Sequence, residues 1–166
     1  MDRLFPGNCL TLVFVLLSIL AFGQEQPADK VSRELLSAHN EARARAGVPP
    51  LTWSTFLEAV ARQWAESLLS SGKFEHQQYS PYGENLFEVR GALFSGAKVV
   101  ETWVNESRDY NAKTNTCRAG AVCGHYTQVI WRNTREVGCA VARGQNREVW
   151  VCEYSPPGNY VGQRPF

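Results

Sequence analysis

Apolar residues recur at helical spacing in the first part of the chain. The first such stretch has its apolar positions at Val31, Leu35, Ala38, Ala42 and Ala46. This pattern predicts a helix that Asp29 caps and that ends at Gly47, which precedes two prolines. His39, Asn40 and Arg43 lie on this helix, and we interpret them as residues that tie it to neighbouring chain.

Two further helices follow by the same reasoning. Thr55 and Glu58 form a capping box for the second helix, and Gly72 ends it. Its apolar stripe consists of Leu57, Val60, Ala61, Trp64, Leu68 and Leu69. Ser95 is expected to cap a third helix that runs through Tyr110, whereas residues 72–96 are expected to be mostly loop.

The pattern changes in the last third of the chain. Residues 123–132 read CGHYTQVIWR and are rich in β-branched and aromatic residues, which predicts a strand with both faces covered. Residues 51–53 form a short extended link, and residues 111–122 are polar and turn-rich. Residues 136–142 and 148–154 are predicted to pair as a hairpin. Helices followed by strands indicate the α+β class.

The N-terminus has the composition of a secretory signal peptide. Arg3 gives a weakly charged start, residues 10–22 are almost wholly apolar, and Ala21 and Gly23 are small residues at the positions that a signal peptidase prefers. The apolar run is too short to span a bilayer comfortably. We therefore expect residues 1–23 to be removed and residues 24–166 to form a single domain.

Charge and cysteine content narrow the classes of protein. The chain has 166 residues with 17 basic and 16 acidic side chains, and it lacks a basic stripe with interleaved aromatic residues, so no nucleic-acid partner is expected. Cys9 leaves with the signal peptide. The four remaining cysteines, which lack CxxC spacing, favour disulfide bonds over a zinc site: Cys117, Cys123, Cys139 and Cys152. Three pairings remain open at this point.

The residues that bear chemistry are few. The chain has three histidines, His39, His76 and His125, but no Gly-x-Ser-x-Gly elbow, no H-E-x-x-H motif and no free mature cysteine. An enzyme is therefore not expected. Asn105 begins a glycosylation sequon, with Ser107 as its third residue.

Five motifs in order resemble the CAP superfamily, which comprises cysteine-rich secretory proteins, antigen 5 and pathogenesis-related protein 1. They are LSAHNEAR at 36–43, PYGENL at 81–86, WVNE at 103–106, GHYTQ with Trp131 at 124–131, and CEYSPPGNY at 152–160. The C-terminal sequence is most similar to the plant pathogenesis-related protein 1 branch. The resemblance implies a three-layer α-β-α sandwich with a central, mainly antiparallel sheet.

The resemblance also implies a cleft lined by two histidines and two glutamates. These map to His76, Glu84, Glu106 and His125. Such a group can hold zinc or another divalent ion through His76 and His125, act as acid and base, or form a structural cluster, and all three readings stay open. No cofactor is required.

Cysteine usage in the relatives bears on the disulfide pairing. Plant relatives carry two further cysteines that this chain lacks together, which is expected if they form one bridge. The resemblance therefore supports pairing of sequence neighbours, Cys117 with Cys123 and Cys139 with Cys152.

The function implied by the resemblance is that of a secreted, monomeric, non-enzymatic defence protein. It would be extracellular, in the apoplast where the source is a plant, and antimicrobial through binding a sterol or other lipid, with microbial membranes as a partner. The loop at residues 87–94 would supply Phe87, Leu93 and Phe94 to the lipid site, although these residues equally suit ordinary core.

Two alternative functions are also consistent with the sequence. The first is a precursor cut between Ser155 and Pro156 that releases residues 156–166 as a signal, although Glu153 and Phe166 depart from the asparagine and tyrosine of the relatives. The second is a metal-dependent hydrolase built on His76 and His125.

Overall fold

The computed structural model describes residue 1 and residues 27–166. The expected signal peptide lies outside the described residues. The elements are α1 (Pro27–Ala46), β1 (Thr52–Trp53), α2 (Thr55–Ser71), β2 (Gly83–Arg90), α3 (Gly96–Val104), the 3₁₀ helix η1 (Asn105–Asp109), β3 (Tyr110–Asn111), β4 (Thr116–Cys117), α4 (Gly124–Val129), β5 (Glu136–Arg143) and β6 (Arg147–Ser155). None of the helices within residues 27–166 combines the length and the hydropathy that a membrane span needs.

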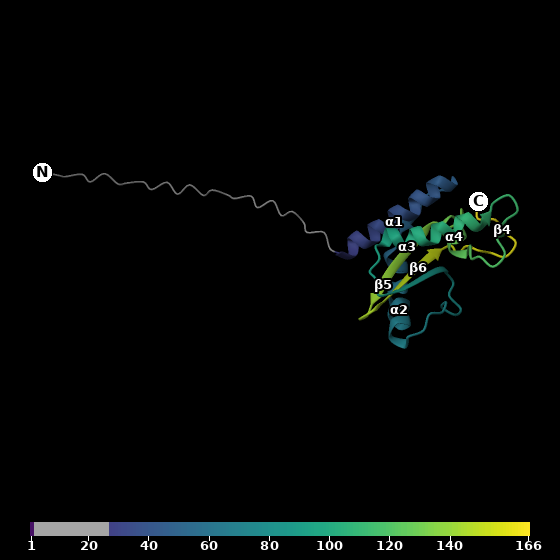
Figure 1. Cartoon of the computed structure of the whole chain (residues 1–166). Helices are drawn as coiled ribbons and strands as arrows, with labels where there is room; N and C mark the ends of the chain where they lie inside the picture. The colour runs from purple at the N-terminus through teal and green to yellow at the C-terminus, as the bar shows by residue number, and fades with distance from the viewer. Residues whose placement is uncertain (2–26) are drawn as a thin grey trace.

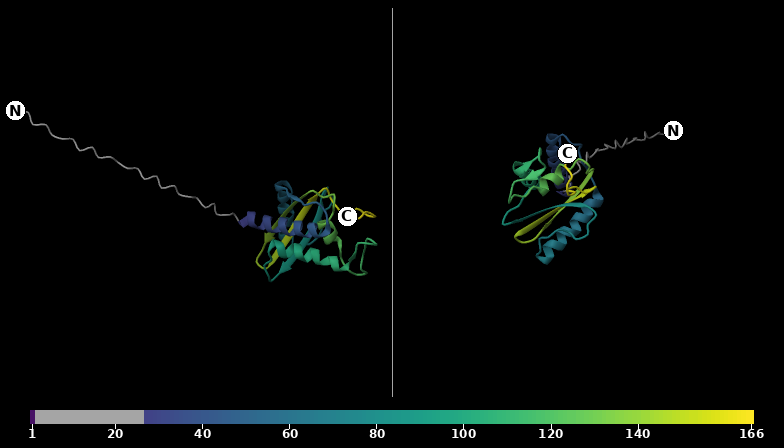
Figure 2. Two further views of the ribbon diagram at one scale, coloured as in Figure 1. Left: turned by 90° about the horizontal axis from the view of Figure 1, so that it is seen from above. Right: turned by 90° about the vertical axis from the view of Figure 1, so that its right-hand side faces the viewer.

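The four-stranded sheet lies between two layers of helices. Its order is β1-β5-β6-β2, with β1 parallel to β5 and the other pairs antiparallel. Helix α2 covers one face, and α1, α3 and α4 lie on the other (Figures 1 and 2). The fold is therefore the expected α+β, three-layer sandwich with a mainly antiparallel sheet.

Each face of the sheet has its own apolar core. The larger one packs Trp150, Cys152 and Tyr154 of β6 against α1, α3 and α4. On the α2 face, Val149 and Val151 pack against Ala61, Ala65 and Leu68 of that helix. Because β6 is central, both of its faces are buried, and this explains the unbroken apolar run at residues 149–152.

The predicted helices α1 and α2 and the β5–β6 hairpin are confirmed to within a few residues, but α1 begins at Pro27, so Asp29 lies within the helix and is not its cap. Gly47 ends α1 with a φ of +69°, the left-handed conformation that glycine favours. The N-cap lies one residue before the position that the predicted capping box gives it. Ser54 is the N-cap of α2, where its hydroxyl accepts a hydrogen bond from Leu57 N at 3.4 Å, while Glu58 instead accepts one from the Trp53 indole at 2.9 Å.

Two boundaries differ from prediction. Residues 83–90, which were expected to be loop, form the edge strand β2, paired along its length with β6. The sequence of β2 is polar and contains glycine, since only Asn85 and Leu86 of its eight residues are buried, so it lacks the apolar pattern that predicts a strand. Ser95 does cap α3, but the α-helix ends at Val104 and continues as η1 only to Asp109, not to Tyr110.

The prediction that residues 123–132 form a strand is wrong, because Gly124–Val129 is the short helix α4. Tertiary partners satisfy both of its ends. The Glu106 carboxylate accepts hydrogen bonds from His125 N and Tyr126 N at 3.0 and 3.1 Å, and the Arg43 guanidinium donates to Val129 O at 2.9 Å. These contacts outweigh the β-propensity of the residues.

The two disulfides are those expected from the resemblance. Cys117 bonds Cys123, which fixes the start of α4 to β4. Cys139 bonds Cys152, and the two residues are direct partners in the β5–β6 register. A bridge of this kind that closes a short loop stabilises a domain by about 3 kcal/mol in the chain-entropy account.

Candidate functional site

His125 and Glu106 form the first of two histidine–glutamate pairs. His125 Nδ1 lies 2.6 Å from Glu106 Oε1, while Glu106 Oε2 accepts from the α4 backbone. The imidazole stacks on Trp103 of α3, with ring centroids 6.1 Å apart and planes tilted by 17°. Glu106 therefore both caps α4 and orients the imidazole that α4 carries.

His76 and Glu84 form the second pair. His76 Nδ1 contacts Glu84 Oε1 in a short ion-paired hydrogen bond, and Gln77 N donates to the same oxygen at 3.2 Å. The hydrogen bond to Glu84 raises the pKa of His76 above its ordinary value, since it favours the charged imidazolium. The Glu84 carboxylate is almost fully enclosed, whereas the His76 side chain is largely exposed.

The two pairs are neighbours through β2. Asn85 follows Glu84 and points to the opposite face, where its side-chain amide donates to His125 O at 3.1 Å. Among residues 27–166, no hydrogen bond or ion pair joins one His–Glu pair to the other. The pocket of about 300 Å³ beside His76 and Glu84 is also lined by Gln128 and by residues 157–159.

The side chains available as ligands restrict the kind of metal site that the two pairs can form. Each imidazole has its Nδ1 held by a carboxylate, the outer-shell arrangement typical of metal-ligating histidines, which leaves Nε2 as the nitrogen for a metal. The described residues contain no group of three or more His, Cys, Asp or Glu side chains able to hold an ion. Because a catalytic zinc needs three protein ligands and a structural zinc four, these residues fit neither, and at most a two-imidazole site.

His39 belongs to the scaffold behind the site. It is fully buried, with Nδ1 2.8 Å from Leu35 O and Nε2 2.8 Å from Tyr154 Oη. The backbone oxygen can only accept, so Nδ1 carries the proton and Nε2 accepts from the tyrosine. Burial lowers the pKa of His39 to about 4, which keeps it neutral. The Asn85 amide also bonds Tyr154 Oη, at 3.1 Å, so this network ties α1 to β6 and β2.

Arg43 is likewise fully buried and supports α4. Its guanidinium donates to four carbonyl oxygens and to no carboxylate: those of Pro49, Val129, Trp131 and Thr134, at 2.6 to 3.1 Å. Burial lowers its pKa to about 10, so the side chain remains charged at neutral pH. Two of the carbonyls lie at or just after the C-terminal end of α4, where a cation is favoured.

The structure separates the three candidate lipid contacts. Phe87 and Phe94 lie with ring centroids 5.1 Å apart and pack against the larger core. Leu93 is 83% exposed and borders a pocket of about 390 Å³ between residues 91–93 and the β5–β6 turn. Of the three, Leu93 is the one whose side chain is exposed, whereas Phe87 and Phe94 are partly buried.

Comparison with known proteins decides the family. The sequence profile of the "CAP: Cysteine-rich secretory protein family" matches residues 36–154. The protein "Pathogenesis-related protein PR-1 type" from Sambucus nigra is 42% identical over 160 residues, covering 96% of each chain. "Pathogenesis-related protein 1A" from Nicotiana tabacum is 44% identical over 156 residues, covering 93% of this chain and 92% of that protein. The chain belongs to the CAP family.

Within the CAP family, the chain is of the pathogenesis-related protein 1 type, as the identity to these two relatives shows.

A solved structure agrees with the fold. The crystal structure of NaASP2 with Zn²⁺ has a similar fold, with a TM-score of 0.67 and 23% sequence identity over 83% of this chain and 85% of that one. At that identity the likeness concerns the fold alone, and it agrees with the α-β-α sandwich described above.

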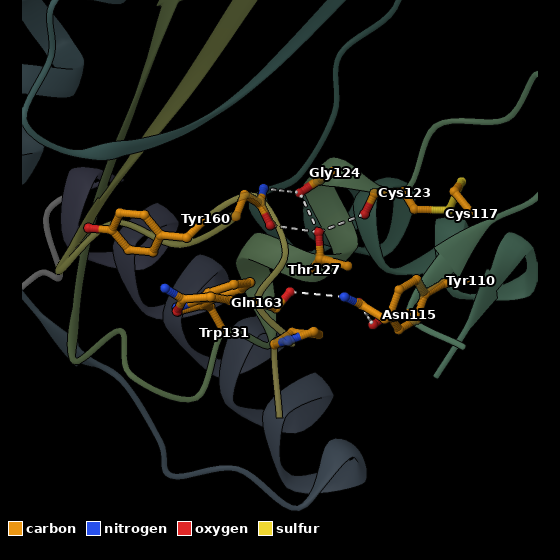
Figure 3. Close-up of a pocket in the computed structure, with 11 residues that line it drawn as sticks. Tyr110, Asn115, Cys117, Cys123, Gly124, Thr127, Trp131, Tyr160 and Gln163 are labelled. Carbon is orange, nitrogen blue, oxygen red and sulfur yellow. Dashed lines mark hydrogen bonds between the residues drawn. A yellow bond between two sulfur atoms is a disulfide. The ribbon is translucent and has the colours of Figure 1, made fainter. Parts of the chain in front are cut away.

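The C-terminal tail of this CAP domain is held against α4 and the small β3–β4 hairpin. Figure 3 shows the pocket between them. Asn159 bonds the Thr127 hydroxyl at 2.7 Å and Gly124 O at 2.8 Å, and Gln163 O accepts from the Asn115 amide at 3.0 Å. The tail thus packs over α4 rather than standing free, and its release between Ser155 and Pro156 stays a prediction.

The sequon is accessible in the CAP fold. Asn105 is exposed at the point where α3 gives way to η1, so a glycan there would project from the surface. It lies beside Glu106, whose carboxylate points the other way, into α4. Glycosylation of Asn105 stays a prediction.

Sequence reasoning missed several residues that support the CAP site. Asn85 sits between Glu84 and Leu86 in the PYGENL motif, and strand alternation places its side chain on the face opposite to that of Glu84. Gln128 is buried and bonds Gly158 N at 2.9 Å. In the sequence, Glu153 stands out only as a departure from the asparagine of the relatives. Its place between Cys152 and Tyr154 in a central strand was the signal that it would be buried.

Proposed function

We propose that this protein is a secreted, non-enzymatic defence protein that acts on microbial membranes by binding a sterol or another lipid. The observation that carries the proposal is its similarity, at more than 40% identity over nearly the whole chain, to plant pathogenesis-related proteins. An N-terminal signal peptide would direct it to the extracellular space and be removed on the way. Its two disulfides are stable in that oxidising environment.

Two features support a binding role over catalysis. Both imidazoles of the site bond carboxylates through Nδ1, and within residues 27–166 no serine, threonine or cysteine side chain forms a hydrogen bond with either ring. A nucleophile activated by a general base needs such a contact. The four cysteines of the described chain are oxidised.

The lipid would contact the surface around Leu93. The adjoining pocket, of about 390 Å³, falls in the usual range for small-ligand sites. Exposed Leu93 offers an apolar contact, and the β5–β6 turn offers polar groups for a lipid hydroxyl.

Replacing Leu93 with serine is expected to weaken sterol binding about tenfold, because burying a leucine side chain against a ligand is worth about 1.5 kcal/mol or more. Fluorescent sterol titration would measure this. The melting temperature should stay nearly unchanged, since Leu93 is exposed. Val161→Ser, at an equally exposed site on the tail, is the matched control and should bind sterol as the parent does. Unchanged sterol affinity in Leu93→Ser would refute this placement of the lipid.

Zinc binding by His76 and His125 is a second, separate proposal, prompted by the NaASP2 structure with Zn²⁺ and by the carboxylate that holds Nδ1 of each imidazole. His125→Ala and His76→Ala should each lower zinc affinity at least about tenfold in calorimetric titration, since a two-ligand site does not survive the loss of one. If the two imidazoles share one ion, the variant that lacks both histidines should bind zinc no more weakly than either single variant. Parent-like zinc affinity in both single variants would reduce the pairs to structural clusters.

A further inference from the structure

Glu153 is the one residue of β6 whose charged group has no partner in the part of the chain that the structure describes. Its side chain is fully buried, and neither carboxyl oxygen accepts or donates a hydrogen bond. Its neighbour on β5 is Gly138, which has no side chain, and its neighbour on β2 is Glu84. Direct partners on antiparallel strands have Cβ atoms about 5 Å apart, so the two carboxyl groups share one face of the sheet.

One carboxyl oxygen of Glu84 likewise lacks a hydrogen-bond partner. Its Oε1 is occupied by His76 and Gln77 N, whereas its Oε2 is buried and has no partner. Two ionised carboxylates side by side in an apolar enclosure would repel each other and lose their hydration. One of them is therefore neutral, or a cation lies between them.

The surroundings do not supply a protein cation for Glu153. On the α2 side, the residues that pack on this face are apolar: Leu57, Ala61, Ala65 and Leu68. Glu58 and Arg62 of α2 pair with each other at 2.6 Å, and His76, from the loop before β2, pairs with Glu84. The Trp64 indole N–H, at the same core, and Gln77 Oε1 are buried without partners as well, but neither carries charge.

We propose that Glu153 is a neutral carboxylic acid that donates a hydrogen bond to Glu84 Oε2 and so positions Glu84 for its contact with His76. A single proton then satisfies one oxygen of each carboxyl group. The arrangement runs as a chain from the sheet interior, through Glu153 and Glu84, to the exposed imidazole of His76.

The electrostatics of Glu153 agree with this arrangement. Burial, with a further contribution from the charge of Glu84, raises the pKa of Glu153 from 4.5 to about 8. Between those pH values the folded protein binds a proton that the unfolded chain has released. The free energy of unfolding therefore falls as pH rises across this window, and above it the accumulated loss stays constant.

The test compares Glu153→Gln, which keeps the shape and an N–H donor but does not titrate, with the parent. The difference in melting temperature, parent minus variant, should be largest near pH 5 and should shrink by several degrees by pH 8. In ¹³C spectra of glutamate-labelled protein, one carboxyl signal should titrate near pH 8, and Glu153→Gln should remove that signal. Glu136→Gln, at an exposed position on β5, is the control and should show no such fall.

Two further measurements test the donor role of Glu153 and the alternative that a cation joins the two carboxylates. Glu153→Leu, which lacks a donor, should melt below Glu153→Gln at pH 5, because Glu84 Oε2 would be left unpartnered; equal melting temperatures would remove the donor role. If calcium at about 10 mM, well above the dissociation constants of extracellular sites, raises the melting temperature of the parent but not of Glu153→Gln, a cation rather than a proton joins the two carboxylates. A pH-independent difference between parent and Glu153→Gln would overturn the proposal outright.

Discussion

Replacing Arg43 with methionine should lower the free energy of unfolding by about 4 kcal/mol. Methionine fills much of the same volume but leaves buried carbonyl oxygens of Val129, Trp131 and Thr134 without donors. Each unsatisfied buried acceptor costs about 1–3 kcal/mol, and α4 also loses the cation at its C-terminal end. Urea denaturation followed by tryptophan fluorescence would measure the loss.

Arg45→Met is the matched control for Arg43→Met. Arg45 lies on the same helix but is exposed, so its replacement should change the free energy of unfolding by less than about 0.5 kcal/mol. A loss of similar size in both variants would mean that charge on α1, and not the carbonyl contacts of Arg43, stabilises the fold.

Replacing Gly138 with alanine should destabilise the protein by about 3 kcal/mol or more. A Cβ atom at this position would lie 2.1 Å from Glu58 N and 2.5 Å from Ser54 O. These are backbone atoms of the first turn of α2, so they cannot move aside as a flexible side chain would, and overpacking of this kind is costly. The whole helix would have to lift from the sheet.

The matched control is Gly144→Ala, in the turn of the same hairpin. Its Cβ would lie 3.4 Å from Leu69 Cδ1, an ordinary contact, so thermal unfolding should be almost unaffected. If Gly138→Ala also melted like the parent, α2 would not be held against β5 as tightly as the structure indicates.

The sequence predicted those parts of the fold in which local pattern and burial agree. Helix α1 has its apolar stripe and its terminal Gly47, and β5 and β6 are apolar runs joined by a polar turn. The same reasoning failed for α4, since Glu106 and Arg43, which lie far from it in sequence, satisfy the ends of this six-residue helix. No pattern within residues 123–132 carries that information.

The candidate site was predictable as a set of residue types but not as an arrangement. The motifs around Glu84, Glu106 and His125 marked these residues through resemblance, and each now has a described partner. That His76 pairs with Glu84 and His125 with Glu106 depends on the register of β2 and on the placement of η1, neither of which the sequence showed. Glu153 escaped notice because a carboxylate in a strand suggests a solvent-facing position.

The contacts of the tail bear on what a cut between Ser155 and Pro156 would produce. Pro165 O accepts from Arg132 N at 2.6 Å, Gly158 lies against the Trp131 ring, and the Arg164 guanidinium reaches Ala112 O at 2.7 Å. None of these contacts requires the peptide bond at the cut. Proteolysis would therefore nick the chain and leave the peptide docked on its parent domain, so that dilution or competition, and not cleavage alone, would govern when it is set free.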